Sequence, residues 1–425
     1  MTLTRRSFLA TVGAGALAAG CSSGGSSSSG DSSGPPTGKI SLLTPIFQAA
    51  PGKKLLEGKL LPAFKKKYPK VTVNVDYTTY DALNEKITTG LASGLLADVL
   101  MLGVGWVPPF AHKKVLAPLP ESLATRYSYQ KRVLDPSRFD GTLYALPVVL
   151  DTRMVAYRKD YFAEAGIKST PANWTELRDM AKELTVRKSG KLTRSGFDPF
   201  SVDLRQCWED FLFSNGGTMF DKSGQTVKFN DDRGIAALQL FLDIIADKST
   251  EFSFTTEEGQ ASSLQQGRSA MMVTNNSLWV SIQQQTPELI KEDKVGAFLM
   301  QNTTPAMLQG GTLVCQSARS KHAAAARALV EFLGTPEVIL PESEERGAVP
   351  SLQNMQSSSY VKGNDFVRFA LSNLDKAYSE GGTPAWMEIR EKVVPTLQTA
   401  VVGKSSAKQA IGDLADLANQ AISRM

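Results

Sequence analysis

Val71-Thr72-Val73-Asn74-Val75-Asp76-Tyr77 alternates apolar and polar side chains, the pattern of a β-strand with one buried face. An amphipathic helical pattern precedes it over 55–68, and another follows it over 80–93. Two further short strands are predicted at 39–44 and 98–102. Strand, helix, strand, helix, strand is the order of an α/β domain. We therefore expect a largely parallel sheet whose ligand lies beyond the carboxyl ends of the strands.

The rest of the chain continues with extended and helical segments and shows no internal repeat. The longest extended stretch covers 146–157. Asn173, with Glu176 three residues later, predicts a helix start because the two side chains can cap each other's backbone amides. Further helices are predicted at 208–215, 232–246, 321–334 and most of 385–425, with a break near Gly403.

The chain has 425 residues and a formal net charge of +5, which suggests two to three domain-sized units without a strong charge bias. Its densest basic run is Lys65-Lys66-Lys67, at the end of a predicted helix. A nucleic-acid binder would gather its positive charge on one face. We therefore expect this run to lie on the solvated end of the helix, and we predict no nucleic-acid partner.

The first residues carry an export signal. Thr4-Arg5-Arg6-Ser7-Phe8-Leu9 is a twin-arginine motif, and a short apolar run over 9–19 follows it. Ala18-Ala19-Gly20-Cys21 resembles a lipoprotein cleavage box, although Leu17 stands one place early. We predict a signal peptide at 1–20 and lipid attachment at Cys21. The alternative is simple secretion, with Cys21 an incidental thiol.

The segment after this cysteine is predicted to be a flexible tether, at 21–38. It consists almost wholly of Ser, Gly, Pro and Asp, which cannot bury apolar area. No other segment reaches the roughly eighteen uninterrupted apolar residues that a membrane span needs. We expect an exported, cell-surface lipoprotein, with a soluble body anchored to the outer face of the cytoplasmic membrane.

Cysteine and histidine are sparse. Beyond Cys21 there are only Cys207 and Cys315, both among apolar residues, so separate buried thiols are favoured over a disulfide. With only His112 and His322 and no Cys-x-x-Cys, we predict neither a metal site nor a cofactor.

Several short motifs follow one another in a characteristic order. They are 91–100 (helix, small loop and Asp-Val strand, with Ala97 where proline is common), 141–147 with Asp151-Thr152 and 157–160, Asn215-Gly216-Gly217, 267–272, 347–350 and 384–389. By the order and spacing of these motifs, the chain resembles the family 1 extracellular solute-binding proteins, the maltose-binding type that serves ABC importers. The resemblance covers nearly all of 39–425.

This resemblance implies two α/β lobes joined by extended crossovers, with a ligand cleft between them that closes by hinge bending. The implied N-terminal lobe comprises 39–150 and 305–337, and the C-terminal lobe comprises 154–302 and 341–425. Crossings are expected near 150–153, 302–310 and 335–340. The implied partners are a small carbohydrate, the permease subunits of an ABC transporter and, through the lipid, a membrane, and the protein is expected to be a monomer.

Tryptophans are the first candidates for the ligand site, because a sugar ring presents apolar faces that flat aromatic side chains can cover. By resemblance, the cleft positions are Trp106, Trp208, Trp279 and Trp386; the alternative for each is a place in the core. Loss of Trp386 is then expected to weaken ligand binding and leave the fold intact. Trp174, beside a helix cap, is expected to be structural.

Polar candidates complete the predicted site. By resemblance, Asp151 accepts hydrogen bonds from ligand hydroxyls, whereas the alternative is an ion pair with Arg153. The other predicted ligand-binding residues are Asn275, Asn276, Gly311 and Thr44. The two asparagines could instead form a turn, and Gly311 could be a hinge glycine.

Other functions are less well supported. The chain lacks a Gly-x-Ser-x-Gly nucleophile motif, a phosphate loop and a zinc motif, so we predict no catalytic residues; a secreted glycoside-acting enzyme is the weaker alternative. A surface adhesin would have no reason to show a two-lobe order. A binding protein for a glycerophosphodiester or another polar solute stays open, because Arg153, Arg205 or Arg346 could bind a phosphate.

Overall fold

The computed structural model describes residues 35–254 and 260–425, so the predicted signal peptide, Cys21 and most of the tether lie outside the described residues. The main sheet has twelve strands. Along its path the strands are β2 (Val71–Tyr77), β1 (Gly38–Thr44), β3 (Val99–Gly103), β12 (Pro305–Gln316), β6 (Ala145–Arg158), β9 (Ser269–Asn275), β8 (Lys191–Asp198) and β7 (Val186–Lys188).

The first lobe is built around β1, which pairs in parallel with both β2 and β3 and confirms the predicted α/β arrangement. β2 alternates between more and less exposed side chains as predicted, whereas the central β3 is buried along its whole length. The helical segments of this lobe are α1 (Ala50–Leu55), the π-helical turn η1 (Leu56–Leu60), α2 (Leu61–Lys67), α3 (Tyr80–Ser93), α4 (Val107–His112), α5 (Ser122–Arg126), α6 (Lys131–Leu134), η2 (Asp135–Ser137), α13 (Ala323–Leu333) and α14 (Pro336–Arg346). A small second sheet joins β4 (Arg138–Phe139) to β5 (Thr142–Leu143).

The second lobe surrounds β9, which pairs in parallel with β8 and antiparallel with β6. Its helical segments are α7 (Lys159–Glu164), α8 (Trp174–Leu184), α9 (Leu204–Ser214), α10 (Asp232–Ala246), α11 (Leu278–Gln285), α12 (Glu288–Lys291), α15 (Ser359–Lys362), α16 (Asp365–Ser372), η4 (Leu374–Lys376), α17 (Trp386–Val401) and α18 (Ala407–Ser423). Short strands extend the sheet here: β10 (Val295–Phe298) pairs with β6, and β11 (Met300–Gln301) and β14 (Ala377–Ser379) pair with β12.

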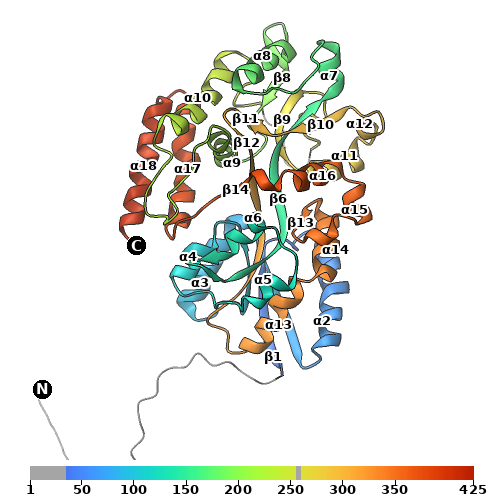
Figure 1. The fold of residues 1–425 in the computed structure, drawn as a ribbon, viewed down its shortest axis with the longest axis vertical. Coiled ribbons are helices and arrows are strands. Elements are labelled where there is room, and N and C mark those ends of the chain that lie inside the picture. Colours follow the sequence, from blue (N-terminus) through green and yellow to red (C-terminus); the bar gives the residue numbers. More distant parts are fainter. Residues whose placement is uncertain (1–34, 255–259) are drawn as a thin grey trace, which may run out of the picture. The chain divides into compact units, whose positions relative to one another are not determined.

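Two long strands, β6 and β12, belong to both lobes (Figure 1). β6 pairs with β12 up to Thr152, and from Arg153 onward it pairs with β9. β12 pairs with β3 from Thr312 onward and with β14 before it. Each strand therefore changes partners near the middle of its length, and the backbone continues without a break from one lobe into the other.

The third predicted crossing differs from the structure. Residues 335–340 begin α14, since Pro336 at the first helical position is compatible with a helix. The helix ends at Gly347, whose φ of 67° is accessible to glycine at little cost. The connection then continues through β13 (Val349–Pro350), which pairs with β6, and η3 (Gln353–Met355). The lobe boundary predicted at 341 therefore falls inside a helix, and the other boundaries stay predictions.

Local capping explains where two of the second-lobe helices begin. Asn173 Oδ1 accepts a hydrogen bond from Glu176 N at 2.9 Å, as predicted, whereas Glu176 Oε2 accepts one at 2.8 Å from Ala172 N, one residue before the N-cap amide. α9 starts four residues earlier than expected because Asp203 caps it.

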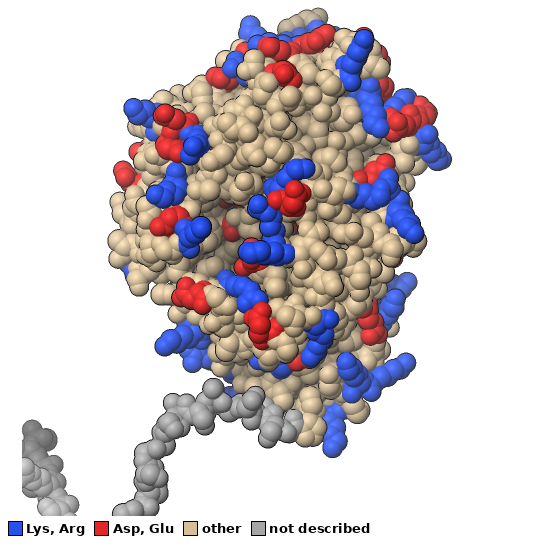
Figure 2. Space-filling model, viewed as in Figure 1, with Lys and Arg blue, Asp and Glu red and all other residues tan. Residues whose placement is uncertain are grey.

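The described surface carries charges of both signs, interspersed over the face in Figure 2. Lys65, Lys66 and Lys67 lie exposed in the last turn of α2, as predicted, where positive charge is favourable beside the helix carboxyl end. None of the described helices is both long enough and apolar enough to span a bilayer. Cys207 and Cys315 are buried free thiols, which confirms the interpretation that they do not pair.

The crossing of β6 and β12 predicts a contrast between two glycines. Gly311 has a φ of +130°, and a Cβ there would lie 2.3 Å from the Val149 carbonyl oxygen. Gly311→Ala is therefore expected to lower the free energy of unfolding by about 1–3 kcal/mol, through backbone strain and steric overlap.

Gly412, inside α18, is the matched control because a Cβ there meets nothing within 4 Å. Gly412→Ala should raise the free energy of unfolding by about 1 kcal/mol, since alanine favours the helix. Urea denaturation of both variants measures this, and equal stabilities would contradict the strain at the crossing.

Candidate ligand-binding cleft

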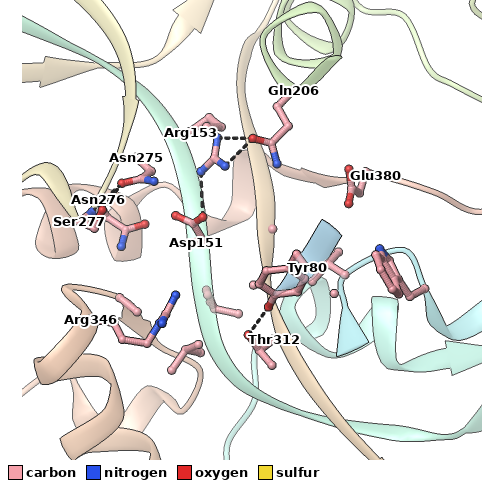
Figure 3. Close-up of a pocket in the computed structure, with 18 of the residues that line it drawn as sticks. Tyr80, Asp151, Arg153, Gln206, Asn275, Asn276, Ser277, Thr312, Arg346 and Glu380 are labelled. Atoms are coloured by element: carbon pink, nitrogen blue, oxygen red, sulfur yellow. Dashed lines mark hydrogen bonds and ion pairs between the residues drawn. The ribbon is translucent and has the colours of Figure 1, made fainter. Parts of the chain in front are cut away.

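A cavity of about 270 Å³ lies where the two lobes meet along β6 and β12 (Figure 3). Both lobes contribute to its lining. The polar side chains that line it are Tyr80, Asp151, Arg153, Gln206, Asn275, Asn276, Ser277, Thr312, Arg346, Glu380 and Arg390. The apolar lining includes Trp106, Val104, Val149, Leu150 and Ala348.

The strand register creates the open space. Gly310 lies directly opposite Asp151, and Gly311 lies opposite Leu150. Residues directly opposite each other in a sheet point their side chains to the same face. Because Gly310 has no side chain, the space beside Asp151 stays unfilled. Gly103, at the carboxyl end of β3, adds a second backbone surface, as expected for a parallel sheet.

A charged and amide network forms one wall. Arg153 Nε and Nη2 both donate to Gln206 Oε1, at 3.1 and 2.5 Å. Arg153 Nη1 lies 3.1 Å from Asp151 Oδ2 but is not aligned for a hydrogen bond. The Arg153 side chain is only 8% exposed, whereas that of Asp151 is 38% exposed. The predicted alternative, an ion pair with Arg153, is thus present, and the Asp151 carboxylate still faces the cavity.

An aromatic wall faces this network from the first lobe. The rings of Tyr80 and Trp106 meet edge to face with centroids 6.4 Å apart, and the Tyr80 hydroxyl lies 2.6 Å from Thr312 Oγ1. Burial raises the pKa of Tyr80 to about 12, so this hydroxyl stays protonated near neutral pH. Because Trp106 is only 1% exposed, the wall presents mainly the partly exposed Tyr80 ring to the cavity, with a hydroxyl that can donate or accept.

Buried acids lie behind the lining. Arg205, on α9, is paired with Glu209 at 3.2 Å and makes a close contact with Glu380. Burial raises the pKa of Glu209 to about 7 and that of Asp210 to about 8. Asp210 Oδ1 accepts from Leu308 N at 2.9 Å, which holds α9 against β12.

Five of the predicted ligand-binding residues line the cavity: Asp151, Asn275, Asn276, Trp106 and Gly311. Asn275 Oδ1 accepts from Ser277 N and Oγ, which is the predicted turn. Asn276 Oδ1 accepts from Thr152 N at 2.8 Å, and its Nδ2 donates to Gly347 O at 2.6 Å. Asn276 therefore joins β6 to the end of α14, and its amide already has partners from the protein.

The other four predicted residues do not line the cavity. Trp208 and Trp386 have no exposed surface, and Trp279 packs on Phe366 with a ring-centroid distance of 5.3 Å. Thr44 is buried, where its hydroxyl accepts from Ile46 N at 3.3 Å. For the three tryptophans, the alternative of a place in the core describes the structure better, because a large aromatic side chain gains most by full burial.

Sequence reasoning missed Tyr80, Gln206, Ser277, Thr312, Glu380 and Arg390. Tyr80 was interpreted only as a helix start, and Thr312 lies in a strand with no distinctive pattern. These side chains become neighbours only through the order of the sheet. Polar residues at or just after strand ends were the one available signal, and it led to Asn275, Asn276 and Thr44 but not to these six.

Comparisons with known proteins place this cleft in context. A family model described as bacterial extracellular solute-binding protein matches residues 49–339. A binding protein of Brucella abortus is 26% identical over 386 residues, which cover 89% of this chain and 92% of that protein. The diacetylchitobiose binding protein of Streptomyces coelicolor is 24% identical over 361 residues, covering 81% of this chain and 82% of that protein.

Solved structures show the same fold. The GacH receptor of Streptomyces glaucescens, solved unliganded and with acarbose, matches with a TM-score of 0.76 at 22% identity, covering 91% of this chain and 99% of that one. A solute-binding protein of Thermotoga lettingae bound with α-D-tagatose matches with a TM-score of 0.75 at 22% identity, covering 90% and 99%. The predicted two-lobe α/β fold is thereby confirmed.

Glu342 gives a prediction on pH. Both of its carboxyl oxygens are buried without a hydrogen-bond partner, and burial raises its pKa from 4.5 to about 9. The folded state therefore holds a proton that the unfolded state loses, so this group lowers stability progressively as the pH rises from about 4.5 to about 9. Glu342→Gln should gain stability relative to the parent between about pH 5 and about pH 8.

Thermal denaturation across this pH range measures the gap between variant and parent. A gap that stays constant with pH would contradict the buried, protonated state of Glu342.

Trp386 gives a second prediction, which revises the expectation from sequence. Because the side chain is fully buried, Trp386→Ala should lower the free energy of unfolding by about 3–5 kcal/mol. The milder Trp386→Phe should recover part of this loss, since it refills part of the space. Unchanged stability of Trp386→Ala in urea denaturation would restore the tryptophan as a ligand platform.

Proposed function

Because the chain belongs to the bacterial extracellular solute-binding proteins, we propose that it captures a carbohydrate, an oligosaccharide or a sugar derivative, in the cleft between its lobes. It then delivers this ligand to the permease of an ABC importer. The observation that carries the proposal is the Tyr80 ring, backed by the buried Trp106 ring, together with the carboxylate, amide and hydroxyl groups opposite it. Sugar rings need both kinds of surface.

The dimensions of the cleft favour a small sugar. Its volume of about 270 Å³ lies just below the range of about 300–1,000 Å³ that is common for small-molecule sites. Closure of the lobes around a ligand would exclude water and present a new surface to the permease.

The cellular setting is part of the same proposal. Export through the twin-arginine signal and a lipid on Cys21 would hold the protein, as a monomer, at the outer face of the cytoplasmic membrane. The tether at 21–38 would let the body reach its permease there. The proposal assigns the cleft to binding alone, with no chemical step.

Asp151 provides the test. In Asp151→Asn the side chain keeps its size but loses its charge, so it accepts ligand hydroxyls more weakly. We expect the affinity for the bound sugar to fall by about tenfold to a hundredfold. A thermal-shift screen over mono-, di- and trisaccharides identifies the sugar first, and calorimetry then compares parent and variant.

Asp293→Asn is the matched control, because Asp293 is 82% exposed and pairs with Lys159 on the surface of the second lobe. It should bind the sugar like the parent. If no saccharide in the screen raises the melting temperature, carbohydrate capture is the wrong assignment for the cleft.

A further inference from the structure

The charges that line the cleft do not balance locally. Its two lining carboxylates already have arginine partners: Asp151 lies 3.1 Å from Arg153, and Glu380 contacts the buried Arg205. The lining also includes Arg346 and Arg390. The surroundings of these two guanidinium groups therefore determine the net charge of the cleft.

Arg346 is held in place by a backbone carbonyl, and its contact with an acid is long. Its Nη1 donates to the Ile46 carbonyl oxygen at 2.9 Å, which fixes the side chain at the end of α14. The acid nearest to it is Glu342, at 3.8 Å from Nε. Burial keeps Glu342 protonated near neutral pH by raising its pKa to about 9. Figure 3 shows the Arg346 side chain on the first-lobe side of the cavity, pointing up toward the open space below Asp151.

Arg390 lacks an acidic partner among the residues that the structure describes. Its guanidinium lies over the Trp106 ring, with the central carbon 5.6 Å from the ring centroid. Its Nε is buried and has no hydrogen-bond partner among the same residues. An unpaired cation at a partly desolvated site is costly, and an anion from outside would offset that cost.

We propose that the ligand is an acidic sugar, whose carboxylate or phosphate binds Arg346 while Arg390 adds favourable charge beside Trp106. The inference rests on the proposed function and specifies its substrate class. The neutral hydroxyls of the ligand would lie against Asp151, and its ring would lie against the Tyr80 and Trp106 wall. Arginine suits this role because its planar group can donate two parallel hydrogen bonds to a carboxylate or phosphate.

The test uses matched pairs of probes with the purified protein. D-glucose is compared with D-glucuronate and glucose 6-phosphate, D-galactose with D-galacturonate, and maltose serves as a neutral disaccharide. Glycerophosphocholine, a zwitterion, serves as a phosphodiester ligand without a sugar. In calorimetry at low salt, at least one acidic sugar should bind about tenfold or more tightly than its neutral counterpart. This advantage should shrink as the ionic strength rises.

Variants identify the contact. Arg346→Gln should weaken binding of the acidic sugar by about tenfold more than binding of its neutral counterpart. Arg346→Lys keeps the charge and should lose less. Arg126→Gln removes an exposed surface charge, 47% exposed and paired with Glu331, so it controls for net charge and should leave the preference intact.

The outcomes separate this inference from the function on which it rests. Neutral sugars that bind as tightly as acidic ones would overturn the acidic class but keep carbohydrate capture. An acidic preference that survives in Arg346→Gln would overturn the assigned contact. Binding of glycerophosphocholine without any sugar would overturn carbohydrate capture and leave the arginine contact standing. No binding by any probe would overturn both.

Discussion

The pairing of β6 with β12 is the contact on which the rest of the structure depends. On its other side, β12 pairs with β3 and β14, whereas β6 pairs with β9. The pair therefore connects the strands of the first lobe with those of the second in one sheet. Their register also determines the cleft, because it places Gly310 opposite Asp151 and leaves that space open. A shift of one residue would turn Asp151 to the other face of the sheet and close the site.

The four arginines at and behind the cleft differ in their partners. Arg205 and Arg153 are buried and engaged by acid or amide groups, so they stabilise the walls. Among the described residues, neither Arg346 nor Arg390 donates a hydrogen bond to an acid, and the acid paired with Arg346 is 3.8 Å away. Buried charges usually keep their partners. We therefore assign Arg205 and Arg153 to the walls of the site, and Arg346 and Arg390 to ligand binding.

The sequence predicted the first lobe well, because its strands and helices have clear periodicity. α3 was predicted at the residues where it lies, and the parallel pairing of β1 with β2 follows from the strand-helix order. The third crossing was misplaced, since Pro336 and the following residues carry no signal that distinguishes a helix start from a turn. Hydrophobic periodicity is less informative at such a proline, because proline is compatible with both a helix start and a turn.

The site was predicted less well than the fold. Asp151, Asn275 and Gly311 lie at strand ends or crossings, where local pattern and position agree. Trp208 and Trp386 are buried and do not line the cavity; the sequence could not show this, because tryptophan suits a core and a sugar platform equally. Tyr80 and Arg390 come from helices far apart in the sequence, so their meeting at Trp106 depends on long-range packing.

Asn276 gives the cleft a mechanical property. Its amide joins Thr152, at the crossing of β6, to Gly347, where the chain leaves α14, while its own backbone continues from β9. One side chain therefore links three segments of the chain: β6, the end of α14 and the end of β9. A rotation of the lobes that broke these bonds would leave a buried amide unpaired, which costs about 1–3 kcal/mol. The least costly rotation of the lobes therefore keeps these hydrogen bonds and has its hinge at Asn276.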